Sequence, residues 1–125
     1  MYEVGTATEV RAFHIMPGVE GPEGVLHAHE YKLEVVVERS ALDERAMVCD
    51  LDLLEEALAN AAAVVHEQNL EVIQPPDAEA VTVEVFSRWL YGAVADAVRA
   101  GGGEMLTVRV WESRVAFGGY GAPLN

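Results

Sequence analysis

The chain has 125 residues, of which 51% are hydrophobic, and its 21 acidic and 8 basic side chains give a net charge of −13. This length is enough for one modest hydrophobic core, so we expect residues 1–125 to form a single domain. Such an acidic surface has no patch that could neutralise phosphates, which argues against nucleic-acid binding and against binding to anionic membranes.

The cysteine content and the first residues of the chain indicate a cytoplasmic protein. Cys49 is the only cysteine, so no internal disulfide can form, as is typical of a reducing compartment. The first nine residues have neither the basic region nor the apolar region of a secretion signal. No apolar run approaches the length needed to span a bilayer.

The first predicted strand covers about residues 2–16. Its even positions from Val4 to Met16 are largely small or apolar, whereas odd positions 3, 9 and 11 are charged. Because successive strand residues point to opposite faces of a sheet, His14 is expected on the inward face.

The second predicted strand covers residues 27–39, after a loop rich in glycine and proline at residues 17–24. His27 and His29 share their parity with the apolar residues at positions 31, 33, 35 and 37, whereas positions 30, 32, 34 and 38 are charged. This alternation places both histidines on the inward face as well.

The three inward histidines, His14, His27 and His29, suggest a metal site. Two imidazoles at i and i+2 on one strand and a third on a neighbouring strand suit tetrahedral Zn²⁺ with one position left open, the pattern of a catalytic zinc site. The alternative is three separate, half-buried histidines, each with its own hydrogen bonds. The residues alone leave both interpretations open.

Two helices are predicted next, followed by a hairpin. Asp50 is expected to cap the first helix, and the second is expected to start near Thr82 and to end at the glycines of residues 101–103. Strands are predicted at residues 105–112 and 114–120, joined around Ser113. The order ββααββ predicts an α+β fold, a four-stranded antiparallel sheet with both helices on one face.

The opposite face of this sheet is predicted to be partly apolar, because Phe13, Ile15, Met105 and Trp111 lie on it. An apolar face on a small sheet with unprotected edges favours self-association.

Glu112 follows the inward apolar positions of the third strand, so its carboxylate is expected at the end of an apolar face. A planar ring with adjacent N–H and NH₂ donors, as in a pterin or guanine, would satisfy both carboxylate oxygens. The alternative is a glutamate at a strand end that faces solvent or pairs with Arg114.

Taken together, these segments resemble the family of 6-pyruvoyl-tetrahydropterin synthases and the related 6-carboxy-tetrahydropterin synthases of queuosine synthesis. The matches occur in the family's order across nearly the whole chain. They are residues 10–14 (family pattern Phe-x-Ala-x-His), 27–31 (His-Gly-His-x-Tyr), 46–51 (Gly-Met-Val-x-Asp-Phe), 81–85 (Pro-Thr-x-Glu-Asn) and 112–113 (Glu-Thr).

This resemblance implies the tunnelling fold (T-fold), in which monomers join edge to edge into a trimeric β-barrel and two trimers stack as a homohexamer. It implies that Zn²⁺ is bound by His14, His27 and His29. It also implies that a small-molecule pterin substrate lies between subunits, held by Glu112 and by groups near Thr82 and Glu84. The simpler role of Thr82 and Glu84 is to cap a helix and to complement its dipole.

Two departures from the family pattern concern the expected acid/base groups. Glu23 occupies the position of the family's catalytic cysteine, and Val65 precedes His66 where the family has an Asp-His pair. The resemblance extends to a variant subgroup with this glutamate, which cleaves dihydroneopterin triphosphate to 6-hydroxymethyl-dihydropterin for folate synthesis. Glu23 is therefore the expected acid/base and His66 the second candidate, whereas their simpler roles are a solvated loop acid and a surface histidine.

The resemblance thus implies a zinc-dependent lyase acting on the side chain of dihydroneopterin triphosphate or a related pterin. The reaction would be carbon–carbon cleavage or triphosphate elimination. Loss of both the cysteine and the aspartate leaves a second hypothesis open, a non-catalytic family member that binds metal and a pterin or purine. A third hypothesis is a purely structural oligomer.

Overall fold

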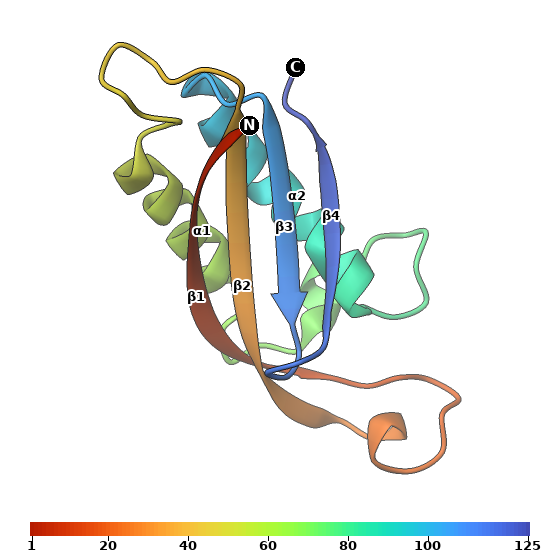
Figure 1. Cartoon of the computed structure of the whole chain (residues 1–125). Helices are drawn as coiled ribbons and strands as arrows, with labels where there is room; N and C mark the ends of the chain where they lie inside the picture. Colours follow the sequence, from red (N-terminus) through yellow and green to blue (C-terminus); the bar gives the residue numbers. More distant parts are fainter.

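The computed structural model describes all 125 residues, as a four-stranded antiparallel sheet with two α-helices on one face (Figure 1). The elements in chain order are β1 (Tyr2–His14), η1 (Pro22–Gly24), β2 (His27–Arg39), α1 (Leu51–Val65), η2 (Leu70–Ile73), α2 (Val83–Ala100), β3 (Met105–Trp111) and β4 (Phe117–Pro123), where η marks a short 3₁₀ turn. The strand order in the sheet is β1-β2-β3-β4, so β1 and β4 are its edges. The predicted ββααββ order and α+β class are confirmed.

The two helices cover different parts of the same sheet face. Helix α1 packs mainly against β1, and α2 packs against β3 and β4 (Figure 1). Neither helix combines the length and the apolar character that crossing a lipid bilayer requires.

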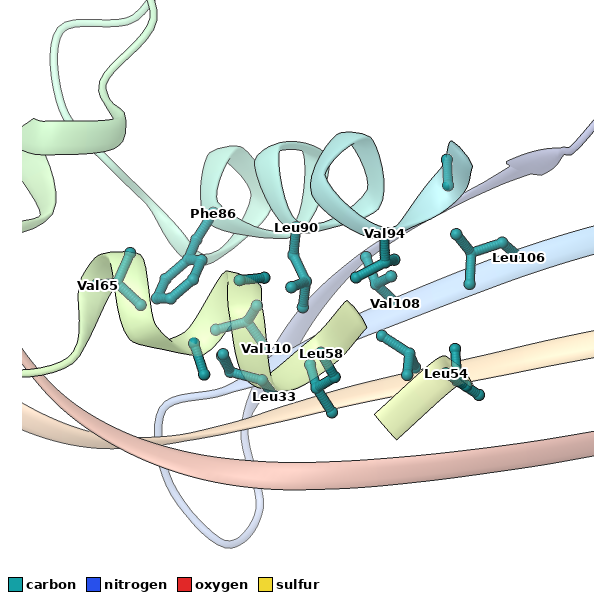
Figure 2. Close-up of a cluster of buried hydrophobic side chains, with 14 of the residues drawn as sticks. Leu33, Leu54, Leu58, Val65, Phe86, Leu90, Val94, Leu106, Val108 and Val110 are labelled. Carbon is teal, nitrogen blue, oxygen red and sulfur yellow. The ribbon is translucent and has the colours of Figure 1, made fainter. Parts of the chain in front are cut away.

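The buried core lies between the sheet and the helices, as Figure 2 shows. The inward positions predicted from alternation are confirmed, because Leu33, Leu106, Val108 and Val110 are all fully buried. Side chains from the helices close the other side of the core: Leu54, Leu58, Val65, Phe86, Leu90 and Val94. Burying a side chain of this size contributes roughly 1.5–3 kcal/mol each.

The helix starts follow the predicted caps. The Asp50 carboxylate accepts hydrogen bonds from the backbone N–H groups of Asp52 and Leu53, and the Thr82 hydroxyl oxygen accepts one from the N–H of Val85. Each cap satisfies donors that the first turn of a helix leaves without intrahelical partners.

Strands β1 and β2 project beyond the other two strands. Their ladder runs from the pair Tyr2–Arg39 to the pair His14–His27, whereas β3 pairs only with residues 32–38 of β2. Residues 27–31 of β2 and their partners on β1 therefore form a two-stranded extension, which Figure 1 shows continuing into the loop with the η1 turn. All three inward histidines lie on this extension.

Some strand boundaries differ from the prediction. Strand β1 ends at His14 instead of residue 16, and β4 begins at Phe117 instead of Arg114. Residues 112–116 form a loop because the Ser113 hydroxyl oxygen accepts hydrogen bonds from two backbone N–H groups within it, those of residues 115 and 116. Glu112 thus lies just beyond the end of β3 and is exposed.

Candidate metal centre

Three imidazoles and one carboxylate converge at the end of the β1–β2 extension. One possible ligand atom from each of His14, Glu23, His27 and His29 lies within 4.8 Å of all the others. The Nε2 atoms of His27 and His29 are 3.0 Å apart, and the Glu23 carboxylate is 3.1 Å from His27 Nε2. Glu23 is also 3.8 Å from His14 Nε2 and 3.9 Å from His29 Nε2.

The strand register brings the three rings together. His14 is paired directly with His27, and their ring centroids lie 4.4 Å apart. His29 is paired with Ala12, whose small side chain is fully buried and leaves space above it for the rings. Because His27 and His29 are two residues apart on β2 and His14 is the direct partner of His27 on β1, the ladder directs all three side chains to one face.

Glu23 reaches the cluster from the loop that joins β1 and β2. It lies in the η1 turn, and its backbone carbonyl accepts a hydrogen bond of 2.8 Å from the N–H of Met16. The turn packs tightly at Gly24, where an added Cβ would lie 1.8 Å from the Val19 carbonyl oxygen. The close contact between Gly24 and the Val19 carbonyl restricts the backbone at the adjacent residue, Glu23.

The hydrogen bonds of the rings indicate which nitrogens are free to bind a metal ion. His27 Nδ1 lies 2.7 Å from the Val25 carbonyl oxygen, so Nδ1 carries the proton and Nε2 is unprotonated in the neutral ring. His14 is only 7% exposed, and neither of its ring nitrogens has a hydrogen-bond partner. Burial, and then the neighbouring His27, lower the pKa of His14.

This donor set fits a divalent metal ion. A buried imidazole without hydrogen-bond partners is costly in an apolar environment, and coordination would satisfy it. Neutral imidazoles and a carboxylate are ligands that Zn²⁺ accepts. Every ion-pair contact of Glu23 goes to one of the three imidazoles, and none goes to a lysine or an arginine.

His14 lines a cavity of about 180 Å³ together with residues of the segment 69–81. A separate cavity of about 500 Å³ lies along β1, β2 and the end of β3, and none of the four clustered side chains lines it. Its eight lining residues are Glu9, Glu30, Tyr31, Lys32, Trp111, Glu112, Ser113 and Arg114. Glu112 therefore lies where a ligand could reach its carboxylate, at the exposed rim of the cavity.

Tyr31 connects the cavity to the histidines. It is 1% exposed, lines the cavity with Glu112, and packs edge-on against His29 with ring centroids 5.5 Å apart. Burial first, and then the carboxylates of Glu112 and Glu23, raise the pKa of the Tyr31 phenol, so the hydroxyl stays protonated and acts as a donor. The sequence prediction omitted Tyr31 from the site, although its parity with His27 and His29 already indicated it.

Thr82 and Glu84 lie away from this cavity within one chain. Thr82 is the N-cap of α2, and Glu84 is exposed in the first turn of that helix. Neither residue lines the cavity of Glu112.

His66 also lies outside the cluster, at the C-cap of α1. Its Nδ1 accepts a hydrogen bond of 3.3 Å from the backbone N–H of Arg11, which requires Nδ1 to be unprotonated. Glu67 pairs with the Arg11 side chain at 3.1 Å, so Arg11 and not His66 is the partner of this carboxylate. Arg11 lies three residues before His14 on β1, which places Arg11 roughly 10 Å along the strand from His14.

A model of the 6-pyruvoyl tetrahydropterin synthase family matches residues 3–122. No curated protein sequence matches this chain.

Several solved structures share the fold. The 6-pyruvoyl tetrahydropterin synthase of Plasmodium falciparum superposes with a TM-score of 0.80 at 11% identity, over 98% of each chain. The Plasmodium vivax synthase gives a TM-score of 0.77 at 11% identity, over 98% of this chain and 99% of that one. The Caenorhabditis elegans synthase gives 0.71 at 17% identity, over 97% and 95%. These likenesses confirm the T-fold.

Two further structures of the Plasmodium vivax synthase carry substitutions of a glutamate that is described as its catalytic residue. The glutamate is replaced by alanine in one and by cysteine in the other.

Proposed function

The chain belongs to the 6-pyruvoyl tetrahydropterin synthase family, and from this premise we propose that it is a zinc-dependent lyase acting on the side chain of dihydroneopterin triphosphate or a related pterin. The observation that carries the proposal is the convergence of His14, His27, His29 and Glu23, a donor set for a divalent metal ion, in a chain of this family. In this proposal Glu112 binds the ring end of such a substrate, and the metal ligands act on its side-chain end. We take residues 1–125 as one domain of a cytoplasmic enzyme.

In this proposal His14, His27 and His29 hold Zn²⁺. The bound metal would supply Lewis acidity to the hydroxyl groups of the substrate side chain. The protein's contribution is to orient the imidazoles and to bury one of them. The Val25 carbonyl orients His27 by accepting its Nδ1 proton, and burial disfavours the charged ring of His14 by lowering its pKa.

Glu23 is the proposed acid/base. Taking the proton from a side-chain hydroxyl lets that carbon form a carbonyl while the adjacent carbon–carbon bond breaks. The electron pair passes to the pterin ring, and a proton is then returned to the carbon that stays attached to the ring. The catalytic glutamate named for the Plasmodium vivax synthase supports this assignment. Elimination of the triphosphate with tautomerisation would use the same base on a different proton.

Glu112 is proposed to bind the pterin ring through a bidentate pair with its N–H and NH₂ donors. Tyr31, which lines the same cavity as Glu112, adds a protonated hydroxyl. Thr82, Glu84 and His66 lie away from the cavity in one chain, so their proposed roles require a neighbouring subunit. Strands β1 and β4 have unpaired edges, and a homohexamer of two trimeric barrels would pair them.

The test is to incubate the purified protein with dihydroneopterin triphosphate and, separately, with dihydroneopterin, and to identify products by chromatography. We expect Glu23→Gln to lower turnover by about 10²–10⁴-fold, the usual contribution of a general base. Glu20→Gln, an exposed acid of the same loop with no polar contact, is the matched control and should retain full turnover. Turnover that survives Glu23→Gln would contradict the acid/base assignment.

The second candidate function is a non-catalytic protein that binds metal and a pterin or purine. It is favoured by the surroundings of His66, whose Nδ1 bonds a backbone N–H and which has no carboxylate partner. This alternative predicts ring binding that is lost in Glu112→Gln, with no turnover of either substrate. A protein that binds neither a transition metal nor a pterin would instead be a structural oligomer.

A further inference from the structure

We propose that Glu23 is the fourth ligand of the metal ion when no substrate is bound, and that the substrate's hydroxyl groups displace it. Its carboxylate then becomes free beside the reacting hydroxyl. The identity of the displacing ligand rests on the proposed function, whereas the coordination by Glu23 stands on the geometry of the four side chains.

The distances within the cluster are those of a four-coordinate site. Bonds of about 2.0–2.2 Å at tetrahedral angles separate neighbouring ligand atoms by roughly 3.4 Å. The Nε2 atoms of His27 and His29 are 3.0 Å apart. Glu23 Oε2 lies 3.1 Å from His27 Nε2 and 3.8 Å from His14 Nε2, and the other carboxylate oxygen, Oε1, lies 3.9 Å from His29 Nε2. These separations lie on both sides of the tetrahedral value. Glu23 contacts all three imidazoles, as a fourth ligand must and as a base directed only at substrate need not.

The loop holds Glu23 in this place without help from a metal. The Met16 N–H binds its backbone carbonyl, and the contact of Gly24 with the Val19 carbonyl leaves no space for a side chain at residue 24. A preorganised ligand loses little conformational entropy when the ion binds.

The charges around the cluster also favour coordination. The Glu23 carboxylate has no lysine or arginine partner, and the imidazoles that surround it include the buried His14, whose ring nitrogens have no hydrogen-bond partner. A divalent cation is the group that would satisfy the carboxylate and the imidazole lone pairs together.

Glu23 can also leave the cluster. Its side chain is 51% exposed, in contrast to 9% for His14, so the carboxylate can turn toward solvent without disturbing the core. Exchange of one carboxylate for the hydroxyls of a substrate would therefore change the coordination while the three imidazoles stay in place. Before the substrate binds, the Glu23 carboxylate would occupy the fourth coordination position and prevent other anions from binding there.

The test uses the full-length protein loaded with Co²⁺, whose visible absorption reports the number and type of ligands. We compare the wild type with Glu23→Ala, Glu23→Cys and the control Glu20→Gln. Glu23→Ala should change the visible spectrum and weaken Zn²⁺ binding, measured by competition with a chelator, by about 10–100-fold. Glu23→Cys should add a thiolate-to-cobalt charge-transfer band, which requires a side chain at residue 23 that is bound to the metal.

Addition of neopterin, an oxidised pterin with the same hydroxylated side chain, should shift the wild-type spectrum and remove the charge-transfer band of Glu23→Cys. Far-UV circular dichroism checks that each variant is folded, which we expect because residue 23 lies in a loop outside the core.

Three outcomes separate this inference from the proposed function. If the spectrum and the Zn²⁺ affinity are the same in the wild type and Glu23→Ala, and Glu23→Cys shows no charge-transfer band, Glu23 is not a ligand even if turnover is observed. If both change with residue 23 but no pterin is bound or converted, the ligand assignment stands and the lyase proposal fails. A protein that binds no Co²⁺ overturns both.

Discussion

Tyr31 packs edge-on against Phe86, with ring centroids 5.3 Å apart, and this contact joins the candidate site to the hydrophobic core. Both residues are fully buried, Tyr31 on β2 next to the histidines and Phe86 in the first turns of α2. The position of the Tyr31 ring therefore depends on the packing of α2, a helix that contributes no side chain to the metal cluster.

Replacing Phe86 with alanine should destabilise the protein by about 3–5 kcal/mol, because it removes an aromatic ring from a close-packed core and leaves a cavity. The measurement is the free energy of unfolding from urea denaturation. Val115→Ala is the control, since Val115 is 87% exposed, and it should change stability by less than about 0.5 kcal/mol. If Phe86→Ala lowered the free energy of unfolding by as little as the control does, this part of the core would not be packed as described.

His27→Ala should abolish stoichiometric metal binding, because it removes an imidazole whose Nε2 lies at the centre of the cluster. The metal content of the purified protein, measured by elemental analysis, gives the result. His66→Gln removes an imidazole outside the cluster and should leave the metal content at the wild-type level. Equal metal content in the wild type and His27→Ala would contradict the metal site.

The metal-free protein should lose stability as the pH falls below about 6.5. The pKa of His14 is lowered in the folded state, first by burial and then by the neighbouring His27 and His29. As the pH falls through about 6.5, His14 therefore binds a proton in the unfolded chain but remains unprotonated in the folded chain. The contribution of His14 is fully present above this pH and is lost as the pH falls toward its folded-state pKa, with a slope of at most about 1.4 kcal/mol per pH unit.

The measurement is urea denaturation of chelator-treated protein at several values of pH between 7.5 and 5, for the wild type and for His14→Phe. The variant keeps a ring in the same buried place but cannot titrate, so its stability should depend less on pH in this window. Parallel curves for the two proteins would show that His14 is not the group responsible.

Gly24→Ala should weaken metal binding because the added methyl group would collide with the Val19 carbonyl oxygen and displace the turn that carries Glu23. The stability of the core should change little, since η1 contains no buried residue. Metal affinity by chelator competition and the free energy of unfolding are measured on the same sample.

The matched control is Gly92→Ala on α2, where an added Cβ meets no atom within 4 Å. This substitution should stabilise the protein by roughly 0.5–1 kcal/mol, because alanine is the better helix former, and should leave metal affinity unchanged. Equal metal affinity in both variants would mean that the tight turn at Gly24 does not position the ligand.

Local sequence patterns were sufficient to predict the architecture. Alternation along β1 and β2 determined which side of the sheet His14, His27 and His29 occupy, because a strand directs every second side chain to the same face. Asp50 and Thr82 determined where the helices start, because each side chain accepts hydrogen bonds from N–H groups only two or three residues ahead of it. These relationships extend over a few residues and need no knowledge of distant partners.

Only the tertiary structure decided how the site is completed. The position of Glu23 depends on a loop that folds back on Met16, and the rim position of Glu112 depends on the turn after β3. No periodic pattern extends through either loop. The sequence therefore identified Glu23 and Glu112 as candidate site residues but could not predict where their carboxylates lie. The separation of His66 from the cluster has the same cause, because its hydrogen bond joins the end of α1 to Arg11, 55 residues earlier in the chain. Contacts over such distances form only when the whole sheet and its helices have packed together.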